Sequence, residues 1–450
     1  MATTSLDPSD LRAPGPAPAG TVGSGRLPET LWPVADALRP FLGRVRPLAE
    51  DGRWLIPIAL AIYVLGTTWT WNFPDWRGIP FPPVWLGFAA ATLLAWRWRR
   101  GSIDPIAAAA IVTFTAMLAT DVTTFWTQGA RDILLYVRSA DQWAHGAPVY
   151  MSVPLSAVPT DLSNYPFLYP PVTLPLFAAL GAIPFPVAAG LWIGVSLALF
   201  LLACRWIGLS WRWSVAMLAW PPVAQGLFVG NVAVPLFALF AAAPWRPALL
   251  AIAPIFKLYS GIATLWLLRR EHWRSLVVGV AVVALACLAT LPLLGPGRWV
   301  EWIGGLRAYQ TSQELLPNLY GFGPARYIPL VVALAVALVV TVLALRARGR
   351  REQLARLGVA TVVGSPSLFS HGFLVALPAM LRLDTPWFWL AFGLTCCAPG
   401  PAWFIALAIV VWSWFEPALR KPRRPDAFHP LATAPGPWPG ALAAKRQGTV

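Results

Sequence analysis

The sequence predicts an all-α fold, a polytopic transmembrane helical bundle, and three observations support this. Hydrophobic residues make up 57% of the 450-residue chain and charged residues only 12%, whereas soluble domains carry roughly 25% charged residues. Apolar runs recur along most of the chain, and arginines gather at their ends, as they do beside transmembrane helices. Since about 20 apolar residues span a bilayer, we expect about 12–14 spans.

Composition divides the chain into three parts. Residues 1–50 are rich in Pro, Gly, Ala and Ser and predict a disordered cytoplasmic N-terminal tail. Residues 51–418 hold all the apolar runs and predict the transmembrane domain. Residues 419–450 return to the composition of the first part, directly after the last apolar run, and predict a cytoplasmic C-terminal tail.

The apolar segments of the middle part differ in length, and several are shorter than a full span. We expect some of these to be tilted, broken or re-entrant. In chain order they begin near Trp54, Pro83, Ile106, Pro170, Pro186, Val215, Val232, Leu249, Leu276, Ile328, Leu357, Phe373, Trp387 and Ala402.

Arginine-rich connections predict the sidedness of the bundle. They follow the second and the eighth segments and join the tenth to the eleventh, so we expect all three to be cytoplasmic. Two long connections, about 121–167 and about 295–326, then fall on the outer side. Their mixture of Trp, Tyr, Arg and carboxylates predicts a large outer loop carrying short interfacial helices. We expect the active site between these two loops.

The overall charge and the cysteines exclude several classes of function. The formal net charge is +15, but the basic residues form no continuous face, so we expect no nucleic-acid partner. The four cysteines lie in apolar stretches and are predicted to be buried hydrophobes. Phosphate-binding glycine loops, zinc motifs and nucleophile elbows do not occur. We therefore expect no cofactor and no metal.

Asp132 is the first candidate for chemistry. It follows Arg131 and precedes an amphipathic stretch that runs through Trp143, so we expect it near the start of a helix in the first outer loop. There the helix dipole favours an ionised carboxylate, available as a base. The alternative is that Asp132 only caps or charges the helix terminus.

Lys257 and His371 are the second and third candidates. Lys257 lies within the apolar run 251–266, where a lysine is costly and marks a functional pocket or a buried partner; the alternative is that it snorkels to an interface. His371 follows a Ser-Pro segment, which predicts a broken helix lining a cavity. The alternative for His371 is a hydrogen-bonded structural role.

Taken in order, these residues resemble the integral-membrane glycosyltransferases of the GT-C class. The likeness is to the polyprenol-phosphate-mannose-dependent α-(1→2)-mannosyltransferase family. It spans about 130–375, although Gly-Asn stands where that family usually has Gly-Gln. The matching residues are Asp132 with Tyr136, Gly146 and Tyr150; Tyr169, Pro170 and Pro171; Gly230 and Asn231; Lys257; and Ser365, Pro366 and His371.

This resemblance implies transfer of a sugar, mannose in that family, from a polyprenyl-phosphate donor to a glycolipid or glycan acceptor at the outer membrane face, with inversion. Asp132 would be the general base, and no general acid is needed because phosphate leaves as a stable anion. Cations would bind the phosphate, and His371 would add a hydrogen bond. The cationic candidates are Lys257, Arg131, Arg138, Arg307, Arg298 and Arg326, and the pocket would be lined by Tyr136, Tyr150, Tyr169 and Asn231.

The alternative function is a transporter or flippase for lipids or polyprenyl-phosphate sugars, without catalysis. It shares the membrane bundle and explains Lys257. However, transporters commonly contain internal repeats, which this sequence does not show, and transport gives no role to a carboxylate in an outer loop. A scaffold membrane protein is a third alternative, and it leaves both Lys257 and the aromatic loop unexplained.

Overall fold

The computed structural model describes residues 129–159, 165–397 and 400–420, with the single positions 62 and 431. The described residues all belong to one unit, Ala49–Val450. That part of the chain is helical and contains no strand, so the predicted all-α class is confirmed for it. The predicted N-terminal tail, most of the C-terminal tail and the first three apolar segments lie outside the described residues.

Each apolar segment predicted from Pro170 onward corresponds to a helix. The α-helices are α5 (Arg131–Ala144), α6 (Leu174–Gly181), α7 (Phe185–Trp206), α8 (Trp211–Ala216), α9 (Pro221–Val229), α10 (Ala233–Ala242), α11 (Ala253–Phe256), α12 (Gly261–Thr264), α13 (Trp273–Leu315), α14 (Leu330–Leu345), α15 (Arg350–Val363), α16 (Leu377–Met380), α17 (Thr385–Leu394) and α18 (Pro401–Trp412). Short 3₁₀ turns connect them, among them η6 (Pro171–Thr173), η8 (Pro247–Ala251), η9 (Leu258–Ser260), η10 (Leu265–Leu268), η12 (Pro317–Tyr320), η14 (Ser370–Ala376) and η15 (Pro417–Leu419).

Helix length in the described part differs from the prediction. Two helices are long and apolar enough to cross a membrane, Phe185–Trp206 and Arg270–Leu315, while the other apolar helices have 10–17 residues. Proline explains much of the shortening, since it lacks the backbone N–H and clashes with the preceding turn. Seven of the described α-helices carry Pro at their first or second position: α6, α7, α9, α11, α16, α17 and α18. The total of 12–14 spans stays a prediction.

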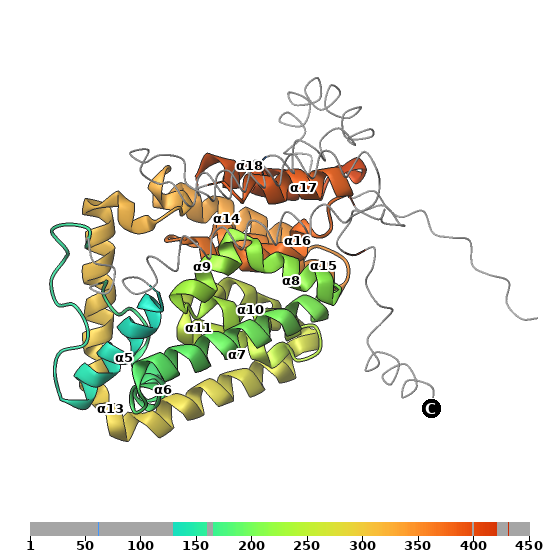
Figure 1. Cartoon of the computed structure of the whole chain (residues 1–450). Helices are drawn as coiled ribbons and strands as arrows, with labels where there is room; N and C mark the ends of the chain where they lie inside the picture. The colour runs from blue at the N-terminus through green and yellow to red at the C-terminus, as the bar shows by residue number, and fades with distance from the viewer. Residues whose placement is uncertain (1–61, 63–128, 160–164, 398–399, 421–430, 432–450) are drawn as a thin grey trace, which may run out of the picture. The chain divides into compact units, whose positions relative to one another are not determined.

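Helix α13 is broken inside its length at Gly295. This glycine has φ 67° and ψ 157° and stands next to Pro296, and neither residue can continue a helix there. Figure 1 shows the two limbs of α13 running in different directions. The first limb is apolar, whereas the second begins with Arg298 and Trp299 and contains the Arg298–Glu301 ion pair at 2.8 Å. The second predicted outer loop therefore starts where the long helix breaks, and its first part is helical.

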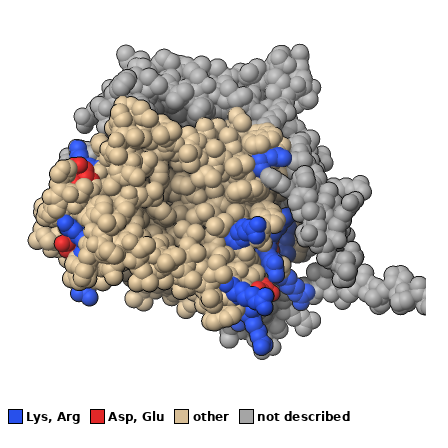
Figure 2. Space-filling model, turned by 90° about the horizontal axis from the view of Figure 1, so that it is seen from below, with Lys and Arg blue, Asp and Glu red and all other residues tan. Residues whose placement is uncertain are grey.

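Exposed apolar side chains follow the long helices. Helix α7 packs against α10, and α14 against α15, while the opposite faces of α7, the first limb of α13 and α14 leave valines and leucines open. Figure 2 shows a broad uncharged face with Lys, Arg, Asp and Glu gathered towards its sides. This pattern suits the hydrocarbon core of a bilayer. The exposed residues include Val187, Leu191, Val195, Val278, Val280, Leu285, Leu288, Val331, Leu338 and Val339.

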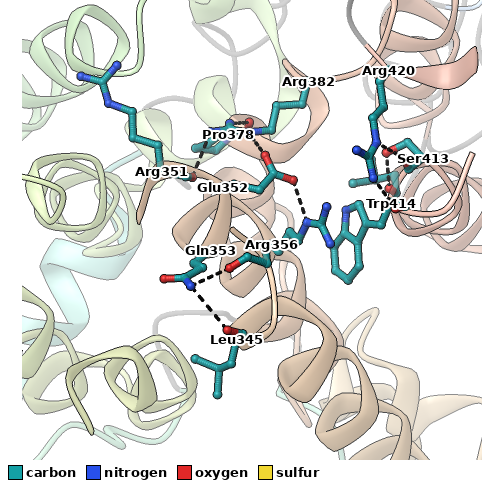
Figure 3. Close-up of polar contacts among 12 residues, drawn as sticks. Leu345, Arg351, Glu352, Gln353, Arg356, Pro378, Arg382, Ser413, Trp414 and Arg420 are labelled. Atoms are coloured by element: carbon teal, nitrogen blue, oxygen red, sulfur yellow. Dashed lines mark hydrogen bonds and ion pairs between the residues drawn. The ribbon is translucent and has the colours of Figure 1, made fainter. Parts of the chain in front are cut away.

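A network of hydrogen-bonded ion pairs joins α15 to the C-terminal end of the described chain (Figure 3), and it uses both carboxylate oxygens of Glu352. Glu352 accepts from Arg356 Nε through one oxygen and from Arg382 Nε through the other, each at 2.6 Å. The Arg356 guanidinium also lies 4.8 Å from the ring centroid of Trp414. Burial alone would raise the pKa of the Glu352 carboxyl, but the charges and hydrogen bonds of Arg382 and Arg356 lower it. The network stabilises the packing of α15 beside α16.

Candidate active site

Helix α5 positions Asp132 in its first turn, as the sequence predicts. The helix is amphipathic and buries Ile133, Tyr136 and Ala140 on one face. No side chain caps its N-terminus, and the preceding residue, Ala130, is buried with φ 55°. Asp132 instead reaches across to Asn231, so helix capping does not account for it.

The turn between α9 and α10 receives Asp132. Asn231 Nδ2 donates to Asp132 Oδ2 at 2.5 Å, and Asn231 Oδ1 accepts from the backbone N–H of Ala233 at 2.9 Å. Gly230 has φ 70°, and a Cβ there would lie 2.3 Å from Cδ1 of Ile133, the residue after Asp132. Only glycine allows α5 to pack this closely on the turn.

A cavity of about 330 Å³ opens beside Asp132. It lies between the two segments predicted as outer loops, because both contribute to its walls. Its polar and aromatic lining consists of Arg131, Asp132, Tyr136, Tyr165, Tyr169, Asn231, Lys257, Tyr259, Tyr309, Gln313, Ser367 and His371. Its apolar lining consists of Leu135, Pro166, Leu168, Phe256, Leu258, Leu306, Pro366 and Phe369.

Lys257 reaches this cavity from a break between two short helices. The sequence predicts Lys257 within the apolar run 251–266. In the structure its backbone is extended, with φ −143° and ψ 109°, between α11 and η9. Helix α11 is only four residues long, and the Ser260 hydroxyl bonds to the carbonyl of Lys257, which starts the following turn. Its Nζ lies 5.7 Å from the ring centroid of Tyr259. Irregular backbone of this kind is tolerated at membrane depth where it lines a cavity.

His371 follows a second break, as its Ser-Pro neighbourhood predicts. Helix α15 ends at Val363, and regular structure resumes only at Ser370. The intervening strand-like segment pairs with the chain near Gly321, where the Phe322 N–H donates to Leu368 O at 2.7 Å. His371 is buried, and its Nδ1 has no hydrogen-bond partner within the described part of the chain. A buried polar atom without a partner beside a cavity is suited to bind a ligand.

The electrostatics of the cavity centre on Asp132. Burial raises the pKa of its carboxyl above the ordinary 3.8, while Arg131, the Asn231 hydrogen bond and Lys257 oppose that shift. Arg131 Nε lies 3.6 Å from Asp132 Oδ1, which is too far for a hydrogen bond. With Lys257 and Arg131 positive and Asp132 negative, the formal charge of the described lining is +1 when His371 is neutral.

Hydrogen-bonded tyrosines form part of the cavity wall. The hydroxyl oxygens of Tyr136 and Tyr169 are 2.9 Å apart in a hydrogen bond, and Tyr150 donates to the Tyr169 carbonyl at 3.0 Å. Tyr136 and Tyr169 line the cavity as expected. Tyr150 lies behind them in the packed aromatic cluster with Phe167, so its contribution is to hold Tyr169 rather than to face a ligand.

Four predicted cationic candidates lie away from this cavity. Arg138 and Arg307 are exposed and absent from its lining. Arg298 pairs with Glu301, and Arg326 donates to the Gly321 carbonyl at 3.0 Å. Of the predicted cations, Lys257 and Arg131 are therefore the two that the structure brings to Asp132.

Five residues of the polar and aromatic lining were not predicted: Tyr165, Tyr259, Tyr309, Gln313 and Ser367. Tyr165 belongs to the aromatic segment before η6, four residues before the predicted Tyr169, and Tyr259 is two residues after the predicted Lys257. Tyr309 and Gln313 are four residues apart on the second limb of α13, which places them on one helical face. This i, i+4 spacing is the sequence feature from which a shared, cavity-facing position of Tyr309 and Gln313 could be predicted. Among the described residues, no group of three or more His, Cys, Asp or Glu side chains could hold a metal ion.

The fold and cavity together indicate a helical membrane protein with a polar, ligand-sized site. Residues 167–370, just under half of the chain, match the model of Glycosyltransferase family 87. Comparison with curated proteins gave no match, and neither did comparison with solved structures. The matched segment includes Tyr169, Asn231 and Lys257 and ends one residue before His371, whereas Asp132 precedes it. The match supports a membrane glycosyltransferase and a glycosyltransferase activity for this chain.

Proposed function

We propose that this protein transfers a sugar, mannose in the first instance, from a polyprenyl-phosphate donor to a glycolipid or glycan acceptor at the outer membrane face. The observation that carries the proposal is the single cavity in which Asp132, Lys257 and His371 meet. These three side chains come from α5, from the break after α11 and from η14, so residues far apart in sequence converge on one site.

The charge of the cavity favours a phosphodiester donor. Its formal charge of +1 is matched by a lipid phosphate sugar, which carries one negative charge, whereas a diphosphate donor would leave a surplus negative charge. Lys257 and Arg131 supply the cationic groups, and arginine is suited to two-pronged contact with phosphate oxygens. His371 Nδ1 would contribute a hydrogen bond.

The dimensions of the cavity favour a small group at the reacting centre. Ligand pockets commonly measure roughly 300–1,000 Å³, and about 330 Å³ lies at the lower end of that range. A sugar ring with its phosphate is of a suitable size, and a long glycan would have to remain mostly outside. The apolar lining, which includes Leu135, Leu168 and Phe256, suits the first isoprene unit of a lipid.

The reaction follows from these positions. Asp132 accepts the proton of the acceptor hydroxyl while that oxygen bonds to the anomeric carbon. The bond from this carbon to the phosphate oxygen breaks, and its electron pair leaves with the phosphate, whose charge Lys257 and Arg131 stabilise. Attack opposite the leaving group inverts the configuration. A raised pKa brings Asp132 closer to the working pH, which makes it a more effective base.

The test uses full-length protein in liposomes with radiolabelled polyprenyl-phosphate sugars, mannose first and then glucose and arabinose, and a glycolipid acceptor. We expect labelled acceptor from wild-type protein and about 10³-fold less from Asp132→Asn. Movement of labelled donor between leaflets without product would favour the transporter. Transfer by an Asp132→Asn variant at the wild-type rate would contradict the role of Asp132 as the base.

A further inference from the structure

The two carboxylate oxygens of Asp132 have different surroundings. Oδ2 accepts from Asn231 Nδ2 at 2.5 Å. Within the described part of the chain, the contact of Oδ1 is with Arg131 Nε at 3.6 Å, which is much longer than the contact of Oδ2. The lone pairs of Oδ1 are therefore the ones left for a substrate.

The amide orientation of Asn231 is fixed from its other side. Its Oδ1 accepts from the backbone N–H of Ala233 at 2.9 Å. If the amide were flipped, its NH₂ would face that N–H, and two donors would oppose each other. Asn231 is buried, so no water can replace the lost contact easily. Nδ2 must point to Asp132, and Oδ2 must remain an acceptor.

The turn that carries Asn231 is held by contacts with α7, through Trp192, and with α5 and the residue before it. The Gly230 carbonyl accepts from Trp192 Nε1 at 2.8 Å, and the Ala130 N–H donates to Phe228 O at 2.8 Å. A Cβ on Gly230 would collide with Ile133. The distance between Asn231 and Asp132 is thus set by one backbone hydrogen bond, by the Trp192 side chain and by the close packing of Gly230 on Ile133.

We infer that Asn231 is the positioning residue of this site, which keeps Oδ2 of Asp132 as a hydrogen-bond acceptor and directs the acceptor's proton to Oδ1. This inference rests on the proposed function and adds which oxygen reacts and what holds it. When Asp132 takes the proton, Oδ2 stays the carbonyl oxygen and keeps its bond to Asn231, so the catalytic helix need not move.

Other charged and titratable groups also face Asp132, and their contributions must be separated from that of Asn231. Arg131 on α5 and Lys257 after α11 favour its ionised form. Tyr169 and Tyr136 interact electrostatically with the Asp132 carboxylate, and His371 in η14 lines the same cavity. Among the described residues, the direct hydrogen bond that reaches the carboxylate from another element is the one from Asn231.

Two substitutions of Asn231 test the inference. Asn231→Asp keeps the contact with Ala233 but places a second carboxylate beside Asp132, and Asn231→Leu removes the donor at similar size. The matched control is Gln353→Leu, which also removes a buried amide. Gln353 bonds Trp266 Nε1 and backbone carbonyls away from the cavity.

We expect both Asn231 variants to lower kcat about 10–100-fold, with the donor KM changed less than about threefold, since the loss falls on the proton transfer. The acid limb of the pH profile should move upward by about one pH unit or more because the ionised form of Asp132 loses a donor. The Gln353→Leu variant should keep the wild-type limb. A loss confined to KM, or an unmoved limb in both folded Asn231 variants, would overturn the inference.

A spectroscopic titration separates failure of this inference from failure of the proposed function. The infrared band of the protonated Asp132 carboxyl is assigned by its absence from Asp132→Asn, and it needs no substrate. We expect the band to persist to higher pH in both Asn231 variants than in wild type. An unshifted band together with normal wild-type transfer overturns only the positioning role. A shifted band in a protein that transfers no sugar supports the positioning role and rejects the proposed function.

Discussion

Two carboxylates in this molecule meet arginines in opposite ways. Glu352 uses both oxygens in 2.6 Å hydrogen bonds to Arg356 and Arg382. Asp132 lies 3.6 Å from Arg131, and only one of its oxygens has a close donor. The pKa of the Glu352 carboxyl is lowered by its partners, and that of the Asp132 carboxyl is raised by burial. The difference separates a structural ion pair from a carboxylate that keeps capacity for a substrate.

We expect neutralisation of the two carboxylates to have different effects, a loss of transfer activity at Asp132 and a loss of stability at Glu352. Asp132→Asn should reduce transfer by about 10³-fold, since a general base contributes about 10²–10⁴-fold, and should leave the melting temperature nearly unchanged because the Asn231 bond can still form. Glu352→Gln should destabilise the fold by about 1–2 kcal/mol, since a charge-assisted network is weakened. Steady-state transfer and thermal unfolding of the same liposome preparations check both.

The distinction between a structural Glu352 and a catalytic Asp132 would be contradicted if each substitution had the effect expected of the other. A Glu352→Gln protein that unfolds normally but has lost transfer would place Glu352 in the reaction. An Asp132→Asn protein that keeps its activity but melts early would make Asp132 a structural residue.

The next largest effect is expected at the cation of the cavity. Lys257→Met should raise the donor KM about 10–100-fold, because one charge-assisted contact to phosphate contributes about 1.5–3 kcal/mol. Arg274→Gln is the matched control, since it removes one exposed positive charge outside the cavity. Donor titrations in detergent measure both. Equal changes in the two variants would mean that overall charge, not the cavity, attracts the donor.

Some features of the candidate site could be predicted from the sequence, and others could not. The position of Asp132 at a helix start followed from amphipathic spacing, and the break before His371 followed from Ser-Pro, because both are local signals. The break at Lys257 was missed because the apolar run is continuous through it, and hydropathy does not register a change of backbone conformation. The walls formed by Tyr309 and Gln313 depend on how α13 turns at Gly295, which places distant residues beside α5.

The opposite pKa shifts predict a pH range in which the protein is folded but inactive. A base with a raised pKa is protonated as pH falls towards and then below that value, so activity is lost at a pH above 3.8. Glu352 has a lowered pKa, so the stability it contributes is present above the ordinary 4.5 and is lost only as pH falls through its lower folded value. We therefore expect reversible inactivation on acidification before the melting temperature declines.

Parallel measurements of kcat/KM and melting temperature against pH test this range. In the Glu352→Gln variant, the acid decline of the melting temperature should become shallower, while the activity limb stays in place. Coincident loss of activity and of folded protein at one pH in the wild type would remove the distinction between the two carboxylates.

The smallest expected effect concerns two buried histidines that extend the comparison. His371 and His272 are both buried. Nδ1 of His371 has no hydrogen-bond partner in the described part of the chain, and His371 lines the cavity. Nε2 of His272 lies 3.3 Å from Glu271 Oε1, and His272 is outside the cavity lining. His371→Leu should raise the donor KM about 3–10-fold, the loss of one neutral hydrogen bond of about 0.5–1.5 kcal/mol. His272→Leu, whose ring packs 3.9 Å from that of Trp266, should change stability and not KM. The two substitutions remove the same imidazole group at similar burial. An increase in donor KM restricted to His371→Leu would assign its unpaired nitrogen to ligand binding. An equal increase in both variants would mean that His371 contributes only to packing.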